Sequence, residues 1–118
     1  MTQRQQYATI SREFLAKARA ALAQGDLDQA SEKGWGAAAQ MVKAIAEQRG
    51  WPHNGHGYLF QNLSRLVAET GDRQLGTLFH VANSLHVNFY EHWLPADLVE
   101  SGLEEVDELV GKLERLLH

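Results

Sequence analysis

Residues 71–95, GDRQLGTLFHVANSLHVNFYEHWLP, are expected to form the element around which the rest of the chain is organised. Apolar side chains recur in it every three or four residues, and at about 100° per residue they share one face of a helix. That face carries Leu75, Leu78, Phe79, Ala82, Leu85, Phe89 and Trp93. The pattern predicts one long helix, opened by Asp72 and ended by Pro95, around which the other helices are arranged.

Four further helices follow from the same periodicity on either side of this stretch. Apolar faces run from Tyr7 to Leu22, from Leu59 to Val67 and from Leu98 to Leu117, and a further helix is expected from about Leu27 to Arg49, with its apolar face between Leu27 and Ile45. A glycine that ends one helix and an aspartate that caps the next occur at residues 25–26 and again at 71–72. Because each single-faced helix must bury its stripe against others, the sequence predicts an all-α, up-and-down antiparallel bundle of about five helices. We expect a single domain over residues 1–118.

The composition excludes several classes of protein. The chain has no cysteine, which removes disulfide scaffolds, zinc ribbons and thiol catalysis. No apolar run approaches the roughly 20 residues that a membrane span needs, so no membrane association is predicted. The first residues, MTQRQQYATISREF, lack the apolar segment of a secretory leader, and the cytoplasm is the expected location.

The charge of the chain argues against a nucleic-acid-binding surface. The formal net charge is −4, the 11 basic residues are scattered, and much of the acid lies between Asp97 and Glu108. Proteins that hold nucleic acid through its phosphates usually display clustered lysine and arginine, so RNA is a disfavoured partner. A second copy of the chain is the expected partner. The apolar face of the last helix is wide, and area left exposed on it would most simply be covered by a homodimer.

The central stretch and the loop before the third helix hold the candidate ligand-binding residues. His86 lies beside the core face of the predicted helix, with Asn83 and Tyr90 next to it at helical spacing. The loop GWPHNGHG, residues 50–57, contributes His53 and His56, and irregular loops of this kind can carry function. Two interpretations stay open. His86 is either a half-buried histidine that holds the bundle through a hydrogen bond, or a binding residue that faces the loop histidines.

Arg73 and His80 form a second candidate pair, on another side of the same helix. They are about two turns apart, so their side chains point the same way. An arginine can stabilise the charge of a phosphorane while an imidazole moves a proton, which is the chemistry of metal-independent RNA cleavage. The alternative is a solvated polar face, since this spacing also arises on any amphipathic helix.

Metal and cofactor sites are not predicted. His53-x-x-His56 could supply two imidazoles to a zinc ion, but no HExxH or comparable ligand pattern completes the set. The glycines of residues 50–57 precede no strand-then-helix unit. They therefore form no phosphate-binding loop of the P-loop or dinucleotide type.

Two patches of the sequence resemble a known family. GDLDQASEKGWGAAAQMVKAIAEQRGW, in the second helix and its loop, and LHVNFYE, in the central helix, are similar to the PaREP1 group of HEPN-domain proteins. The resemblance covers about residues 10–95, with both patches in the expected order. It implies an all-α bundle that commonly pairs into homodimers, which agrees with the fold predicted from the periodicity.

The wider superfamily implies two functions for this chain. Its catalytic members cut RNA, often in toxin–antitoxin or defence settings beside a nucleotidyltransferase-like partner. They carry an arginine shortly before a histidine near the start of a late helix, a pattern that Arg73 and His80 match. However, the patch most like PaREP1 centres on His86, which no arginine precedes at that distance. We therefore expect a non-catalytic module that binds a protein partner or a nucleotide, with a ribonuclease acting at a dimer cleft as the alternative.

Overall fold

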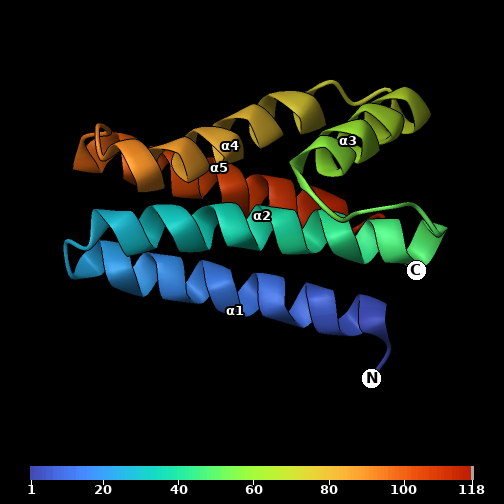
Figure 1. Cartoon of the computed structure of the whole chain (residues 1–118), viewed down its shortest axis with the longest axis horizontal. Coiled ribbons are helices and arrows are strands. Elements are labelled where there is room, and N and C mark those ends of the chain that lie inside the picture. Colours follow the sequence, from blue (N-terminus) through green and yellow to red (C-terminus); the bar gives the residue numbers. More distant parts are fainter. Residues whose placement is uncertain (118) are drawn as a thin grey trace.

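Five α-helices make up the regular structure of residues 1–117, the part of the chain that this computed structural model describes (Figure 1). They are α1 (Gln3–Ala23), α2 (Leu27–Arg49), α3 (His56–Thr70), α4 (Gln74–Glu91) and α5 (Ala96–Glu114). The helices α1, α2, α4 and α5 run along the long axis of the molecule, and the shorter α3 is inclined to them. Residues 1–117 contain no strand, and the predicted all-α bundle of five helices is confirmed.

The ends of α1 and α2 follow from local side-chain chemistry. Thr2 caps α1 in a capping box, in which its hydroxyl accepts from the backbone of Gln5 and the Gln5 side chain accepts from the backbone of Thr2. Asp26 accepts the backbone N–H of Gln29 at 3.1 Å and so starts α2. Gly50, with φ 70°, ends α2 in the left-handed conformation that favours glycine. The predicted bounds of α2 are confirmed because both of its ends carry such signals.

The helix α4 is shorter than the sequence predicts, because a side chain within it closes its last turn. The helix ends at Glu91, and His92 adopts φ 57° just outside it. The Oδ1 atom of the buried Asn88 accepts the backbone N–H groups of Trp93 at 2.8 Å and Leu94 at 2.7 Å. These two bonds satisfy the donors beyond the helix and hold the chain in its turn towards α5.

The turn between α4 and α5 overturns one predicted core position. Trp93, expected on the buried face, is 64% exposed. The prediction assumed that the helix continues to this residue, whereas α4 ends at Glu91. Phe89 is only partly buried. The remaining residues of the predicted face are buried: Leu75, Leu78, Phe79, Ala82 and Leu85. Pro95 is the N-cap of α5 and not a residue of its first turn.

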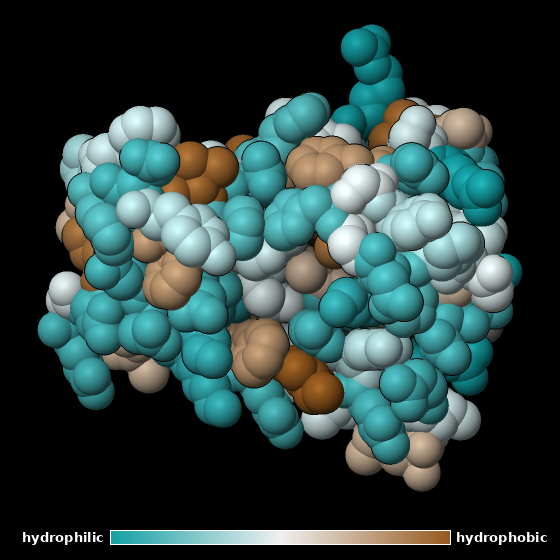
Figure 2. All heavy atoms as spheres, in the orientation of Figure 1, coloured by the Kyte–Doolittle hydropathy of each residue, from teal (hydrophilic) through white to brown (hydrophobic). Residues whose placement is uncertain are grey.

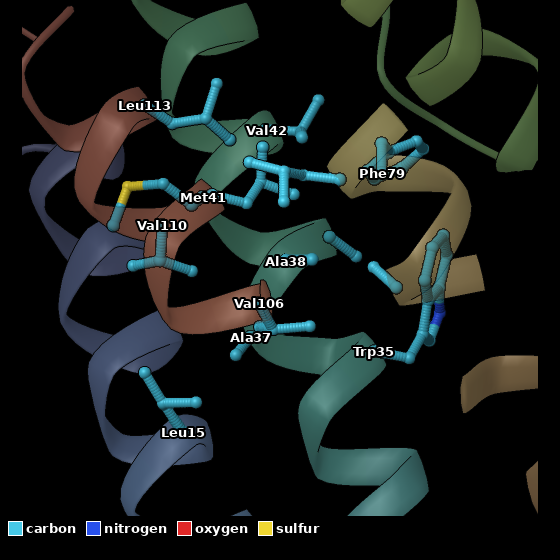
Figure 3. Packing of buried hydrophobic residues seen from close by; sticks show 14 of the residues in the cluster. Leu15, Trp35, Ala37, Ala38, Met41, Val42, Phe79, Val106, Val110 and Leu113 are labelled. Carbon is cyan, nitrogen blue, oxygen red and sulfur yellow. The ribbon is translucent and has the colours of Figure 1, made fainter. Parts of the chain in front are cut away.

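The bundle is organised around α2, and the expectation that residues 71–95 hold this place is wrong. The helix α2 packs against each of the other four helices, whereas α4 packs against α2, α3 and α5. Twelve residues of α2 are buried, against six of α4. Figure 3 shows Ala37, Ala38, Met41 and Val42 of α2 among side chains of α1, α4 and α5. The many alanines of α2 allow neighbouring helices to come close on several sides.

The helices α2, α4 and α5 approach one another closely at two glycines. A Cβ atom on Gly34 of α2 would lie 2.5 Å from Leu103 Cδ2 of α5 and 3.0 Å from Leu85 Cδ1 of α4. A Cβ atom on Gly102 of α5 would lie 3.0 Å from Leu85 Cδ2. Glycine at these positions therefore leaves the space that the leucine side chains of the two neighbouring helices occupy.

The wide apolar face of α5 is buried within the chain. Its buried residues are Val99, Gly102, Leu103, Val106, Leu109, Val110 and Leu113. Leu98, which is 50% exposed, lies outside this set. Little of the face is left for a second copy to cover. If the chain forms a homodimer, the contact must therefore involve a surface other than the apolar face of α5.

Polar side chains cover most of the face seen in Figure 2, with separate apolar patches between them. Within residues 1–117, the large hydrophobic side chains that are exposed are Met1, Tyr58, Tyr90, Trp93 and Leu98. Three of these five lie in or beside the turn between α4 and α5. None of the helices in this part of the chain combines the length and the hydropathy that a membrane span requires.

Candidate functional site

Four rings from three helices form what we call the aromatic–imidazole cluster: Trp35 of α2, His56 of α3, and His86 and Tyr90 of α4. The ring centroids of Trp35 and His56 are 4.6 Å apart with an interplanar angle of 11°, so these rings are stacked. The His86 centroid lies 4.5 Å from that of His56 and 5.1 Å from that of Trp35. Tyr90 meets His86 edge-on at 5.3 Å. Of the five predicted ligand-binding residues, three (His56, His86 and Tyr90) are thus brought together.

Each ring of the cluster is placed by a definite element. His86 and Tyr90 are one turn apart on α4, which puts them on the same side of the helix. His56 is the first residue of α3 and follows Gly55, whose φ of 113° is a conformation that other residues rarely adopt. Trp35 is 8% exposed and supports the cluster from the core side. His86 makes no side-chain hydrogen bond within residues 1–117, so the geometry favours the interpretation in which it faces His56.

The surroundings of His86 favour its neutral form. Burial lowers the pKa of His86 below its ordinary value of 6.5, the nearby His56 lowers it further, and Glu32 opposes both effects. Within residues 1–117 no carboxylate lies at hydrogen-bonding distance from the ring of His56 or His86. A histidine that acts as a general base is usually oriented by such an acid. In the described residues neither histidine of the pair is oriented by a carboxylate.

A shallow hollow of about 210 Å³ lies beside the cluster. It is lined by Trp35, Gly36, Ala39, Gln40, Lys43, Gly55, His56 and Leu59. Lys43 has no ion-pair partner within residues 1–117. Pockets for small molecules usually measure about 300–1,000 Å³. The hollow therefore has room for a ring or an anionic group but not for an enclosed cofactor.

Two predicted ligand-binding residues, His53 and Asn83, lie outside the cluster. His53 meets Tyr7 of α1 edge-on, with ring centroids 5.5 Å apart, and its Nε2 is 3.0 Å from a carboxylate oxygen of Glu47. Its Nδ1 atom is buried without a hydrogen-bond partner in residues 1–117. Asn83 is half-buried on α4 and makes no side-chain hydrogen bond in the same part of the chain. His53 therefore ties the loop after α2 to α1 and does not face His86.

The predicted catalytic pair, Arg73 and His80, is exposed. Arg73 is the N-cap of α4, and His80 lies about two turns further on. His80 borders a hollow of about 230 Å³ whose other lining residues are Phe60, Leu63, Ser64, Val67, Gly76 and Phe79. Arg73 does not line this hollow. Within one copy of the chain the hollow is thus largely apolar, and it lacks the cation that RNA cleavage would use.

The HxxH spacing of residues 53–56 does not gather metal ligands in this fold. The ring of His53 lies against Tyr7, whereas the ring of His56 lies against Trp35. Nowhere in residues 1–117 do three His, Cys, Asp or Glu side chains come together as a metal ion would need. A protein zinc site requires three or four ligands. The two histidines of this motif therefore lie against different neighbours.

Two residues of this region, Trp35 and Asn88, are not predicted from the sequence. Trp35 lies at the edge of the apolar face of α2, and only the packing of α3 and α4 shows that it faces two histidines. Asn88 lies beside the predicted apolar face of α4 and not on it, so its burial follows only from the packing of α2 against α4. Its Nδ2 donates to the Oγ atom of Ser31 in α2 at 2.9 Å, and both residues are buried.

These features define the class of protein, a small all-α bundle built on a central alanine-rich helix. Within that class, the chain belongs to the archaeal PaREP1/PaREP8 family, which matches residues 6–110. The predicted resemblance to the PaREP1 group is thereby confirmed. The crystal structure of a protein from Sulfolobus solfataricus is similar, with a TM-score of 0.78 and 26% sequence identity over 90% of this chain and 94% of that one. A comparison with curated proteins finds no match.

Proposed function

We propose that the chain is a non-catalytic docking module, which binds a protein partner through the exposed side of the aromatic–imidazole cluster. The observation that carries the proposal is the position of Tyr90, 65% exposed, on a set of rings anchored by the buried Trp35. Aromatic side chains contribute much of the binding free energy at protein interfaces, and more so when a rigid scaffold presents them. Tyr90 and His56 supply such area, since both are exposed while the ring behind them is packed.

The proposal includes a HEPN-like fold and pairing with a second copy, which the resemblance implies. The same resemblance makes a nucleotidyltransferase-like protein the first partner to test. Sedimentation equilibrium of the purified chain measures its mass in solution, and a mass twice that of one chain would support pairing. A mass of one chain at all concentrations would remove the homodimer from the proposal.

A nucleotide is the second candidate ligand, because of the hollow beside the cluster. Lys43 borders this hollow together with His56. An anionic group would contact the cation there while a base stacks on the exposed face of the imidazole. Calorimetric titration with AMP tests this candidate, with Lys43→Ala as the matched variant. Binding by the parent that the variant loses would favour a nucleotide, and no heat from the parent would exclude AMP.

A metal-independent ribonuclease that uses Arg73 and His80 at a dimer cleft is the alternative to a docking module. To separate the two, the purified chain is incubated with mixed RNA in EDTA, beside folded Arg73→Ala and His80→Ala variants. We expect no cleavage by any of the three, because Arg73 lies outside the hollow that His80 borders. Cleavage by the parent that is lost in both variants would replace the docking module with the nuclease.

The docking site itself is tested by copurification from an archaeal cell extract, with bound proteins measured by mass spectrometry. The tagged parent is compared with Tyr90→Ala and His56→Ala, which change exposed rings of the cluster, and with Ser84→Ala, an exposed control on α4. We expect a protein that the parent and Ser84→Ala retain and that both cluster variants lose about tenfold, as interface aromatics typically show. An identical set of proteins with all four chains would contradict the site.

A further inference from the structure

The exposed turn between α4 and α5 combines apolar area with several carboxylates. We define the α4–α5 corner by its exposed rings, carboxylates and leucine, which are Tyr90, Glu91, Trp93, Asp97, Leu98 and Glu100; the exposed His92 between them pairs with Asp28 of α2. Its apolar members Tyr90, Trp93 and Leu98 are 65%, 64% and 50% exposed. No lysine or arginine occurs between Arg73 and Lys112, whereas seven acidic residues do. The corner therefore presents rings and carboxylates with no neighbouring lysine or arginine in its own helices, and of its residues only Glu100 borders a hollow together with Arg19 of α1.

The corner is held rigidly, although it lies in a turn. The backbone N–H groups of Trp93 and Leu94 donate to Asn88, which is 1% exposed and donates in turn to Ser31 of α2. His92 adds a contact of 2.7 Å between its Nδ1 and Asp28 of α2. An exposed aromatic side chain on a fixed backbone loses little conformational entropy when it is covered by a partner. The backbone of Trp93 is therefore already fixed before a partner binds.

Glu91 is a carboxylate of the corner whose position in its helix is unfavourable. It is the last residue of α4, at the negative end of the helix dipole, and the last turn of α4 contains no basic residue. Asp97, by contrast, lies in the first turn of α5, where a carboxylate is favourable. A cation placed beside Glu91 would interact favourably with both the carboxylate and the helix end.

We infer that the α4–α5 corner binds a basic segment of a protein partner, with an arginine or lysine that lies over Trp93 or Tyr90 and pairs with Glu91. A cation over an aromatic ring and beside a carboxylate gains from both interactions. A second copy of the corner would bring carboxylates against carboxylates, and the phosphates of nucleic acid or lipid would meet the same repulsion. The inference rests on the proposed docking function and specifies the chemistry of the partner.

The test titrates the full chain with a synthetic peptide of alternating arginine and alanine and measures binding by isothermal titration calorimetry, which follows the parent and the variants without Trp93 in the same way. We expect Glu91→Gln and Trp93→Ala each to weaken binding about three- to fivefold. Glu108→Gln is the matched control, since it removes the same charge from an exposed position further along α5, and it should weaken binding less than about twofold.

Three outcomes would overturn the inference. In the first, the parent does not bind the peptide. In the second, Glu108→Gln weakens binding as much as Glu91→Gln, which would indicate general charge attraction. In the third, the parent forms a dimer that Trp93→Ala abolishes, which would show that a second copy covers the corner. If the peptide fails while His56→Ala still loses a copurifying protein, the inference falls and the docking function stands. If the peptide binds as expected but His56→Ala retains every protein, the cluster is wrong and the corner stands.

Discussion

Both polar atoms of the buried Asn88 side chain have hydrogen-bond partners. Its Oδ1 accepts two backbone N–H groups and its Nδ2 donates to Ser31, so the amide is satisfied although it is buried. The hydrophobic period alone continues past this residue to Trp93. The helix stops earlier because the amide offers the backbone an alternative to further helical bonds.

Replacing Asn88 by alanine should lower the free energy of unfolding by about 2 kcal/mol, since it leaves a buried hydroxyl and two backbone donors without their partner. Asn83→Ala removes the same side chain from the same helix at a half-buried position. It should change the free energy by less than about 0.5 kcal/mol. Urea denaturation of the three proteins measures both values. Equal losses in the two variants would show that the network around Asn88 contributes nothing of its own.

The histidines show how far residue spacing can lead. Neighbours on one helix are predictable, and Tyr90 does lie beside His86. The residue from another helix that contacts His86 is not predictable, because the sequence offers no reason to choose between His53 and His56. Only the packing of α3 distinguishes them, when it stacks His56 on Trp35 and leaves His53 against Tyr7.

Among the helices, the bounds of α2 are predicted well from the sequence, but its central position in the bundle is not. Asp26 and Gly50 mark the start and the end of α2 by local chemistry, which does not depend on the rest of the fold. The central position of α2 depends instead on what its small residues allow. At Gly34 the absence of a side chain lets Leu103 and Leu85 pack against the backbone of α2.

The packing at Gly34 predicts opposite effects for two glycine-to-alanine changes. Gly34→Ala would gain helix propensity of up to about 1 kcal/mol but should cost about 1–3 kcal/mol in overpacking, so a net loss is expected. Gly111→Ala in α5 meets only the end of the Arg115 side chain, at 3.9 Å, and should gain about 0.5–1 kcal/mol. Thermal or urea unfolding of both variants gives the two signs. A gain in stability for Gly34→Ala would mean that α5 shifts at little cost.

For the whole molecule, charge and burial together determine how stability responds to pH. The carboxylate of Glu114 accepts a hydrogen bond from Arg12, which joins α5 to α1 and lowers the pKa of that carboxyl below its ordinary 4.5. This contribution is present at neutral pH and is lost only in more acidic solution. His86 acts in a different range. Its pKa is lowered from 6.5 by burial, so the folded state binds its proton less readily than the unfolded chain does.

It follows that stability should fall as the pH decreases through about 6.5, because the unfolded chain takes up a proton at His86 before the folded chain does. His86→Gln removes this group and should flatten the dependence. His80→Ala, at an exposed position, should retain it. Urea denaturation at several pH values measures the slope for each protein. A parental slope in His86→Gln would assign the effect to another group.

The apolar face of α5 also has a consequence during synthesis on the ribosome. The helices α1 to α4 leave the exit tunnel first, while the residues from Val99 to Leu113 that complete their core are still missing. Until then the inner faces of α2 and α4 stay open to solvent and to other nascent chains. The interval before α5 emerges is therefore when this protein most needs a chaperone.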